Sequence, residues 1–232
     1  MDSCLISDVH LQVAWYGGPR NYLATGRSKR FVNRFSTEYV KCKAVHGLLR
    51  TFVHPPAELF SRPGYLHALE GKFLYWLAMQ VPAGGQVVEV GSFKGKSSGF
   101  LAAGLTRGGS LACVDTWSND AMPYDEPADT MSEFLANVSR YRDCIDVCRG
   151  RSAEVAAGWS RPVDLLFIDG DHSYEGCSAD LTSWLPHVRC AGWIAFHDSS
   201  VEGVTGAIRD FYPRSMRYSE RVAWSIFAAR RR

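Results

Sequence analysis

One stretch of the chain, residues 163–198, restricts the possible folds more than any other. It holds two apolar runs of strand length, Leu165–Ile168 and Trp193–Phe196, and the residues between them are apolar at helical spacing. Near-continuous apolar runs are typical of parallel strands that are buried on both faces. We therefore expect a strand–helix–strand unit with a right-handed crossover, as in an open α/β sheet.

Each of the two apolar runs leads directly into charged residues. Asp169 follows the first run, and His197 and Asp198 follow the second. The carboxyl ends of parallel strands meet at one edge of the sheet, which is where open α/β folds bind ligands. The sequence thus predicts a ligand site here, although aspartates in such places can also simply cap turns.

Further strands are predicted at Gln86–Val90, Ser110–Val114, Ile145–Cys148 and Ala223–Ala229. Helical patterns alternate with most of them, and the last strand follows a turn. This order indicates a doubly wound α/β sheet with an antiparallel finish. Residues 1–62 are expected to form an arm and a helical cap, with one helix over Phe31–Phe52 and the next from about residue 65 to 80.

Length and charge narrow the class of protein. The chain has 232 residues, of which 46% are apolar, enough for one α/β domain with an appendage. A net charge of +2 argues against a nucleic-acid partner, although basic residues are concentrated in the first quarter. No membrane-spanning run or signal-peptide pattern is evident, so we expect a cytoplasmic protein without a membrane partner.

The strand Gln86–Val90 runs into a turn, Gly91–Ser98, that opens a helix. Such a turn presents backbone N–H groups and the positive end of a helix to a ligand. A Walker A motif is excluded because Val90 stands where the first glycine is required. Ser97 is interpreted either as a helix N-cap or as a ligand contact.

Two acids belong to the first two strands. Asp115 ends the second strand, where an acid would bind ribose hydroxyls. Glu89 lies inside the first strand, where a buried carboxylate is costly unless it is paired. It is therefore expected to face a cofactor crevice or a neighbouring N–H.

Taken in order, the segments VVEVGSFKGKSS, LACVDTW, LLFIDGDHSYEG and WIAFHD resemble the class I S-adenosylmethionine-dependent methyltransferases. More narrowly they resemble the metal-dependent small-molecule O-methyltransferases of the catechol and caffeoyl-coenzyme A types and the bacterial natural-product group. The resemblance covers about residues 65–198. It implies a Rossmann-like, mostly parallel seven-stranded sheet, residues 63–232 as the cofactor-binding domain, and a homo-oligomer.

The resemblance also assigns roles to single residues. Trp117 is interpreted either as stacking on the adenine or as anchoring a loop. The positions that match cofactor contacts are Glu89, Gly91, Phe93, Ser97, Asp115, Ser152 and Asp169.

Asp169 and Asp198 match metal-binding carboxylates, and His197 stands where relatives carry another acid. Carboxylates suit Mg²⁺, and imidazole suits Mn²⁺ among other ions, so either ion is expected. His172 matches a basic residue that takes the substrate proton, and an ordinary pKa near 6.5 suits a general base. Asp169 and His172 are thus the predicted catalytic residues.

Divalent-metal-assisted O-methylation of a small-molecule hydroxyl, on a sugar or a phenol, is the leading hypothesis. Antibiotic or other natural-product biosynthesis is the setting that the resemblance implies. A metal-independent methyltransferase acting on nitrogen or RNA is the alternative, and a phosphotransferase or a non-catalytic cofactor-binding module is a remote one. The loop Thr116–Asp129 and the cap are expected to cover the substrate.

Overall fold

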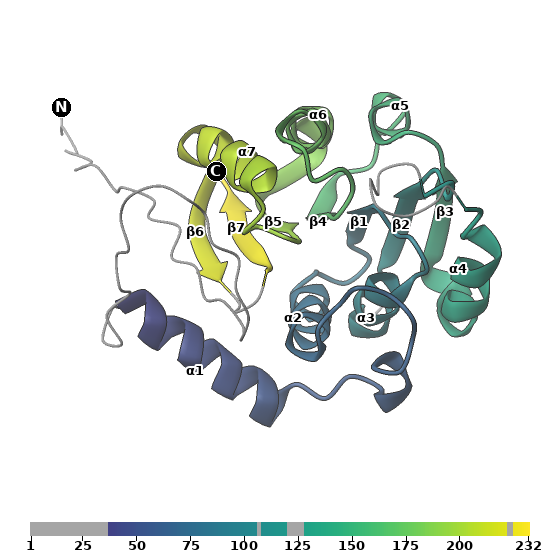
Figure 1. Ribbon diagram of the computed structural model, residues 1–232, viewed down its shortest axis with the longest axis horizontal. Helices are drawn as coiled ribbons and strands as arrows, with labels where there is room; N and C mark the ends of the chain where they lie inside the picture. The colour runs from purple at the N-terminus through teal and green to yellow at the C-terminus, as the bar shows by residue number, and fades with distance from the viewer. Residues whose placement is uncertain (1–36, 106–107, 120–127, 222–224) are drawn as a thin grey trace.

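A computed structural model describes residues 37–105, 108–119, 128–221 and 225–232, and all structural statements here concern those residues. The fold has three layers, with a central sheet between two layers of helices (Figure 1). One face is covered by α2 (Ala68–Met79), α3 (Lys96–Gly104) and α4 (Met131–Val138). The other is covered by α5 (Ser152–Ala157), α6 (Tyr174–Trp184) and α7 (Glu202–Ser215).

The sheet has seven strands in the order β3-β2-β1-β4-β5-β7-β6. The strands are β1 (Gln86–Val90), β2 (Ser110–Asp115), β3 (Ile145–Arg149), β4 (Val163–Ile168), β5 (Val188–Phe196), β6 (Met216–Arg221) and β7 (Phe227–Arg231). The first five are parallel, and β7 runs antiparallel to both β5 and β6. The predicted doubly wound α/β fold with an antiparallel edge is confirmed.

Apolar residues on both faces of the central strands form the core. Val87 and Leu165 pack toward α2 and α3, whereas Val88 and Leu166 pack toward α6 and α7, and all four are fully buried. Burial of such a side chain contributes about 1.5–3 kcal/mol to stability. This two-sided burial is why Leu165–Ile168 of β4 is a continuous apolar run in the sequence.

The N-terminal helix α1 (Thr37–Phe52) packs on α2, where its residue Leu49 joins the core. Lys72 Nζ of α2 donates to the carbonyl oxygen of Leu49 at 3.2 Å. The helix expected from Phe31 is thus described from Thr37 onward, and the predicted arm lies outside the described residues, as do residues 120–127 of the expected covering loop.

The C-terminal strands differ from the residue-level prediction. The last strand is Phe227–Arg231 rather than Ala223–Ala229, and residues 222–224 lie outside the described part of the chain. The edge strand β6 carries Arg217, Glu220 and Arg221 and has no apolar alternation that would predict it. Charged residues are common on edge strands because they prevent pairing with another chain.

The strand order brings the carboxyl ends of β1 and β4 together at one edge of the sheet. β1 and β4 are neighbours although they are far apart in the chain, so their carboxyl ends lie at the topological switch point. Asp169 N donates to Val90 O at 2.8 Å, and His197 N donates to Ile168 O at 3.0 Å. The residues that follow β1, β4 and β5 are therefore held side by side.

Candidate active site

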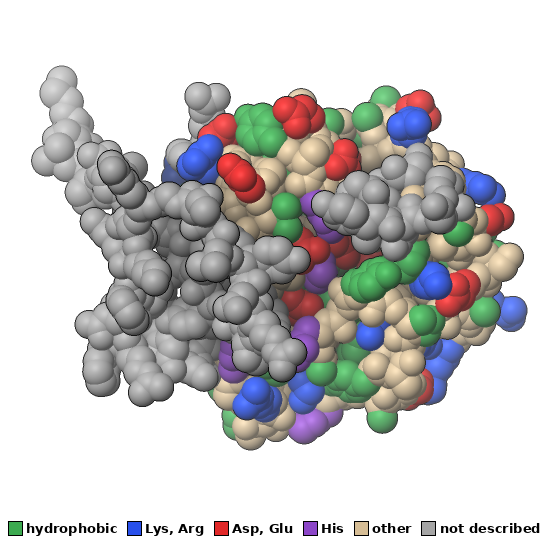
Figure 2. Space-filling view, in the orientation of Figure 1, with side chains coloured by type: hydrophobic (Ala, Val, Ile, Leu, Met, Phe, Trp, Pro, Cys, Tyr) green, Lys and Arg blue, Asp and Glu red, His purple; other side chains and the backbone are tan. Residues whose placement is uncertain are grey.

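A cleft of about 430 Å³ opens at this edge, between the turns that follow β1 to β5. Pockets for small molecules and cofactors have volumes of about 300–1,000 Å³. Acidic and histidine side chains gather in the hollow near the centre of the face that Figure 2 shows. The cleft is thus large enough for a ligand, and a group of acids and histidines lies within it.

Gly91 sets the shape of the wall that follows β1. Its φ of 84° lies in the left-handed region, and a Cβ atom at this position would collide with the carbonyl group of Asp169. Glycine therefore lets the turns after β1 and β4 approach each other. Gly91 and Asp169 both line the cleft, as predicted.

Asp115 anchors the neighbouring wall. Its Oδ2 accepts from Phe93 N at 2.8 Å, and its Oδ1 accepts from Trp117 N at 2.6 Å. Asp115, Phe93 and Ser97 all line the cleft. The N-cap of α3 is Gly95, so of the two interpretations of Ser97 the N-cap is wrong.

Glu89 lies below this wall and does not line the cleft. It is fully buried and accepts hydrogen bonds from the hydroxyls of Ser92 and Ser98. Burial raises the pKa of Glu89 to about 7, because the hydroxyl bonds offset only part of the desolvation and the charge of Asp169 adds to it. Both hydroxyls bond to Oε2, which ties Glu89 to the Gly91–Ser98 turn, whereas its buried Oε1 has no hydrogen-bond partner in the described residues.

Trp117 also lies behind the cleft. Its fully buried ring packs on Phe134, with centroids 4.8 Å apart, and its Nε1 donates to Phe93 O at 3.0 Å. This geometry matches the loop-anchoring interpretation and leaves no ring face for an adenine. Ser152, by contrast, lines the cleft, and its Oγ accepts from Trp184 Nε1 at 2.9 Å.

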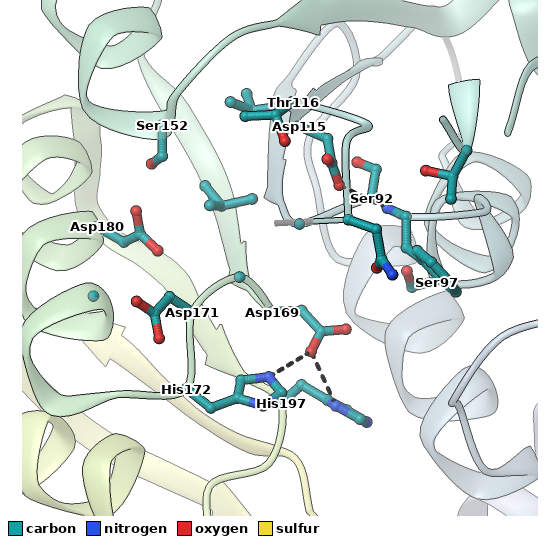
Figure 3. Close-up of a pocket in the computed structure, with 18 of the residues that line it drawn as sticks. Ser92, Ser97, Asp115, Thr116, Ser152, Asp169, Asp171, His172, Asp180 and His197 are labelled. Carbon is teal, nitrogen blue, oxygen red and sulfur yellow. Dashed lines mark hydrogen bonds and ion pairs between the residues drawn. The ribbon is translucent and has the colours of Figure 1, made fainter. Parts of the chain in front are cut away.

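Asp169, His172 and His197 meet at the end of the cleft nearest β5 (Figure 3), and the carboxylate of Asp198 lies beside the two imidazoles. Asp169 Oδ1 lies 3.0 Å from His197 Nδ1 and 3.5 Å from His172 Nε2. Asp198 Oδ2 lies 3.3 Å from His197 Nδ1 and 3.7 Å from His172 Nδ1. The structure therefore brings together all four residues that the sequence predicted for the catalytic and metal site.

The four groups perturb one another strongly. Burial would raise the pKa of Asp169, but the charge of His197 and hydrogen bonds from both histidines outweigh it and hold that pKa below the usual value. Asp198 behaves in the same way, with a lowered pKa that His197 causes against the effect of burial. A hydrogen bond with Asp169 raises the pKa of His172. Such perturbed pairs in a cleft are typical of functional sites.

The donor set fits a divalent cation. Asp169, His172 and Asp198 each offer one ligand atom, and these atoms all lie within 4.8 Å of one another. His172 Nε2 is a buried nitrogen that faces Asp169 Oδ1 at 3.5 Å, too far and too poorly aligned for a strong hydrogen bond. His197 Nδ1 faces the same two carboxylates, so the expected ligands converge, and His172 lies beside them as either a further ligand or a base.

Two buried acids near the site carry no signal in the sequence motifs. Asp180 of α6 lines the cleft, and burial raises its pKa to about 6. Glu70 of α2 is 3% exposed, and its Oε2 lies 3.3 Å from His197 Nε2. A helical glutamate 127 positions before its partner leaves no local pattern from which sequence reasoning could find it.

Part of the chain matches a known protein family. Residues 88–199 match the family model described as a methyltransferase domain. Residues 88–199 are a methyltransferase domain. The match begins in β1 and ends just after Asp198, so this domain contains both walls of the cleft and the four clustered residues, and the methyltransferase recognised in the sequence is confirmed.

Solved methyltransferases share the fold at low identity. The O-methyltransferase TomG of Streptomyces achromogenes, solved with S-adenosylmethionine, has a TM-score of 0.60 and 17% identity, over 85% of this chain and 99% of that one. The Bacillus cereus O-methyltransferase, solved with S-adenosylhomocysteine, has a TM-score of 0.54 and 18% identity, over 84% and 93%. The methyltransferase PaMTH1 of Podospora anserina has a TM-score of 0.61 and 13% identity, over 90% and 100%.

One curated relative of the methyltransferase domain has no assigned role. It is the uncharacterized protein y4gI of Sinorhizobium fredii, 28% identical over 136 residues. The match covers 56% of this chain but only 15% of the relative. In the part of the chain that the structure describes, no helix has the length and apolar character needed to cross a membrane.

Proposed function

We propose that the protein is an S-adenosylmethionine-dependent O-methyltransferase that methylates a small-molecule hydroxyl with the help of a divalent cation. The observation that carries this proposal is the convergence of two carboxylates, Asp169 and Asp198, with the imidazoles of His172 and His197 at one end of the cleft. The turn at Gly91 and the acid Asp115 form the remainder of the same cleft. One cleft therefore offers places for a cofactor, a cation and a base.

The cofactor half fits S-adenosylmethionine. Asp115 is fixed by two backbone N–H groups and still has lone pairs for ribose hydroxyls. Ser152 stands on the opposite wall, where an adenine would lie. The cofactor supplies a methyl group on a sulfonium. The residues of this chain have to hold that methyl in line with the acceptor oxygen, since geometry is most of the task in such a displacement.

The other half fits the acceptor. A cation held by Asp169, Asp198 and His197 would favour the ionised form of the acceptor hydroxyl. His172 is proposed as the base, because it lines the cleft and its buried Nε2 is held only weakly by Asp169 Oδ1, 3.5 Å away. When bound, S-adenosylmethionine would supply the methyl group: the new carbon–oxygen bond would form as the carbon–sulfur bond breaks, and the electron pair would stay on sulfur. His172 would accept the hydroxyl proton. Asp169 accepts from the resulting imidazolium.

The acceptor class is a further part of the proposal. TomG, which shares the fold, is described as an O-methyltransferase involved in tomaymycin synthesis. This supports a natural-product hydroxyl, on a phenol or a sugar, as the acceptor here.

The test begins with calorimetric titration of S-adenosylmethionine, with Asp115→Asn as the variant expected to weaken binding. Transfer of labelled methyl groups to a panel of phenols and sugars, with matched amines and RNA beside them, then identifies the acceptor. We expect product only from hydroxyl acceptors. Methylation of an amine or of RNA would overturn the proposal of O-methylation.

A further inference from the structure

Glu70 makes more contacts than a helix-capping residue needs. Its Oε2 accepts from His67 N at 2.8 Å, which closes the capping box at the start of α2. The same atom lies 3.3 Å from His197 Nε2. Its Oε1 accepts from Ser225 N at 3.0 Å and from Ser225 Oγ at 2.7 Å. One carboxylate thus joins α2, the end of β5 and Ser225, two residues before β7.

Capping accounts for only one of these contacts. Ser225 and His197 lie 155 and 127 positions away along the chain, so neither helps to start the helix. Burial of a carboxylate is costly unless hydrogen bonds and an opposite charge compensate it. Burial would raise the pKa of Glu70, but the hydrogen bond and charge of His197, with Ser225 and His67, outweigh it and lower that pKa. The ionised form is therefore the one that the fold stabilises.

His197 is the link between Glu70 and the cleft. Its side chain is 6% exposed, with Nε2 toward Glu70 and Nδ1 toward Asp169 and Asp198. An imidazole ring that is held at one nitrogen can present the other in only one direction. A carboxylate that accepts the second N–H of a metal-binding histidine fixes the orientation of that ring in many metal sites.

We propose that Glu70 is a positioning residue, which fixes the ring of His197 and through it the arrangement of Asp169 and Asp198. α2 would then set the geometry of the acidic end of the cleft, although it lies outside the matched methyltransferase domain. The effect on cation binding rests on the proposed function, whereas the orientation of His197 does not.

The test uses the full chain with Glu70→Gln, because glutamine can still cap α2. The first readout is the ¹⁵N-edited NMR signal of the His197 side chain, assigned by its disappearance in His197→Gln. The second is calorimetric binding of Mn²⁺ alone. We expect Glu70→Gln to shift the His197 signal and to weaken Mn²⁺ binding by about 10–100-fold.

Asp164→Asn is the matched control. Asp164 is 9% exposed and its Oδ2 accepts from Gln86 N at 2.9 Å, so this variant also replaces a buried, hydrogen-bonded carboxylate. It lies in β4 near its first residue, at the opposite edge of the sheet. The control is expected to lower stability but to leave the His197 signal and Mn²⁺ binding unchanged.

Three outcomes decide the proposal. If Glu70→Gln shows the same His197 signal and the same Mn²⁺ affinity as Asp164→Asn, Glu70 acts only as a helix cap and the proposal is overturned. A shifted His197 signal in a protein that binds no Mn²⁺ would support the positioning role and remove the cation from the proposed function. If Glu70→Gln does not fold, Ser225→Ala, which removes one bond to Glu70 Oε1, takes its place: a shifted His197 signal supports the proposal, and an unchanged one overturns it.

Discussion

His172 Nε2 lies 3.5 Å from Asp169 Oδ1. After a small movement of either side chain, the carboxylate can accept a hydrogen bond from this nitrogen when it is protonated. The loop that carries both residues begins where β4 ends, so this spacing is set by the chain itself. A base beside a carboxylate can be stabilised as it becomes charged. Variants of these two residues can therefore distinguish a catalytic base from a metal ligand by experiment.

Replacing His172 distinguishes a base from a ligand. We predict that His172→Gln lowers kcat by about 10²–10⁴-fold, which is the usual contribution of general-base catalysis, and leaves Mn²⁺ binding unchanged. Steady-state methyl transfer and calorimetry with Mn²⁺ measure the two effects. His187→Gln, outside the cleft, is the control. A parallel loss of Mn²⁺ binding would instead make His172 a ligand.

Comparison of Gly91 with Gly84 separates the close approach of Gly91 to Asp169 from the strain of a positive φ angle. Both have positive φ angles, 84° and 68°, but a Cβ atom on Gly84 meets nothing within 4 Å, whereas one on Gly91 collides with Asp169. Gly84→Ala should cost only the left-handed strain, about 1–2 kcal/mol. We predict a clearly larger fall in Tm for Gly91→Ala, together with lost binding of S-adenosylhomocysteine. Equal Tm values for the two variants would contradict this account of Gly91.

Glu89 makes stability depend on pH in a direction that can be tested. Its pKa is raised from 4.5 to about 7, so between these pH values the native state retains a proton that the unfolded state has released. The contribution of Glu89 to stability therefore falls as pH rises through this interval. Over the same interval, Glu89→Gln should gain about 3 kcal/mol in unfolding free energy relative to the wild type.

Urea unfolding at a series of pH values measures this difference. Glu133→Gln, which removes an exposed partner of Lys94, is the control and should show no such trend. If the unfolding free energies of the wild type and Glu89→Gln change with pH in parallel, the pKa of Glu89 is not raised in the folded protein.

The sheet and the clustered residues were largely predictable because their signals are local. Two-sided burial gives β4 and the second half of β5 near-continuous apolar sequences, and parallel strands bring Asp169 and Asp198, which follow them, to one edge. The edge strand β6 was not predictable from its residues, since a solvated edge does not need an apolar pattern. The start of the last strand, at Phe227 rather than at Ala223, was not predictable either.

Two residues at the site have side chains whose direction the sequence does not determine. Trp117 and Glu89 stand at positions that match cofactor contacts, yet both turn behind the wall and bind it through Phe93 O and two serine hydroxyls. Sequence position fixes which turn a residue belongs to, but packing decides which side of the turn its side chain occupies. Glu70 was missed for a related reason, because its partner His197 is a tertiary neighbour only.

The most direct test of the central claim is the rate of methyl transfer from S-adenosylmethionine to a hydroxyl acceptor before and after treatment with a chelator. We predict that the wild type loses activity on chelation and recovers it with Mn²⁺ or Mg²⁺, and that Asp169→Asn does not recover. An unchanged rate in the chelated wild-type protein would contradict cation-assisted methyl transfer at Asp169 and Asp198.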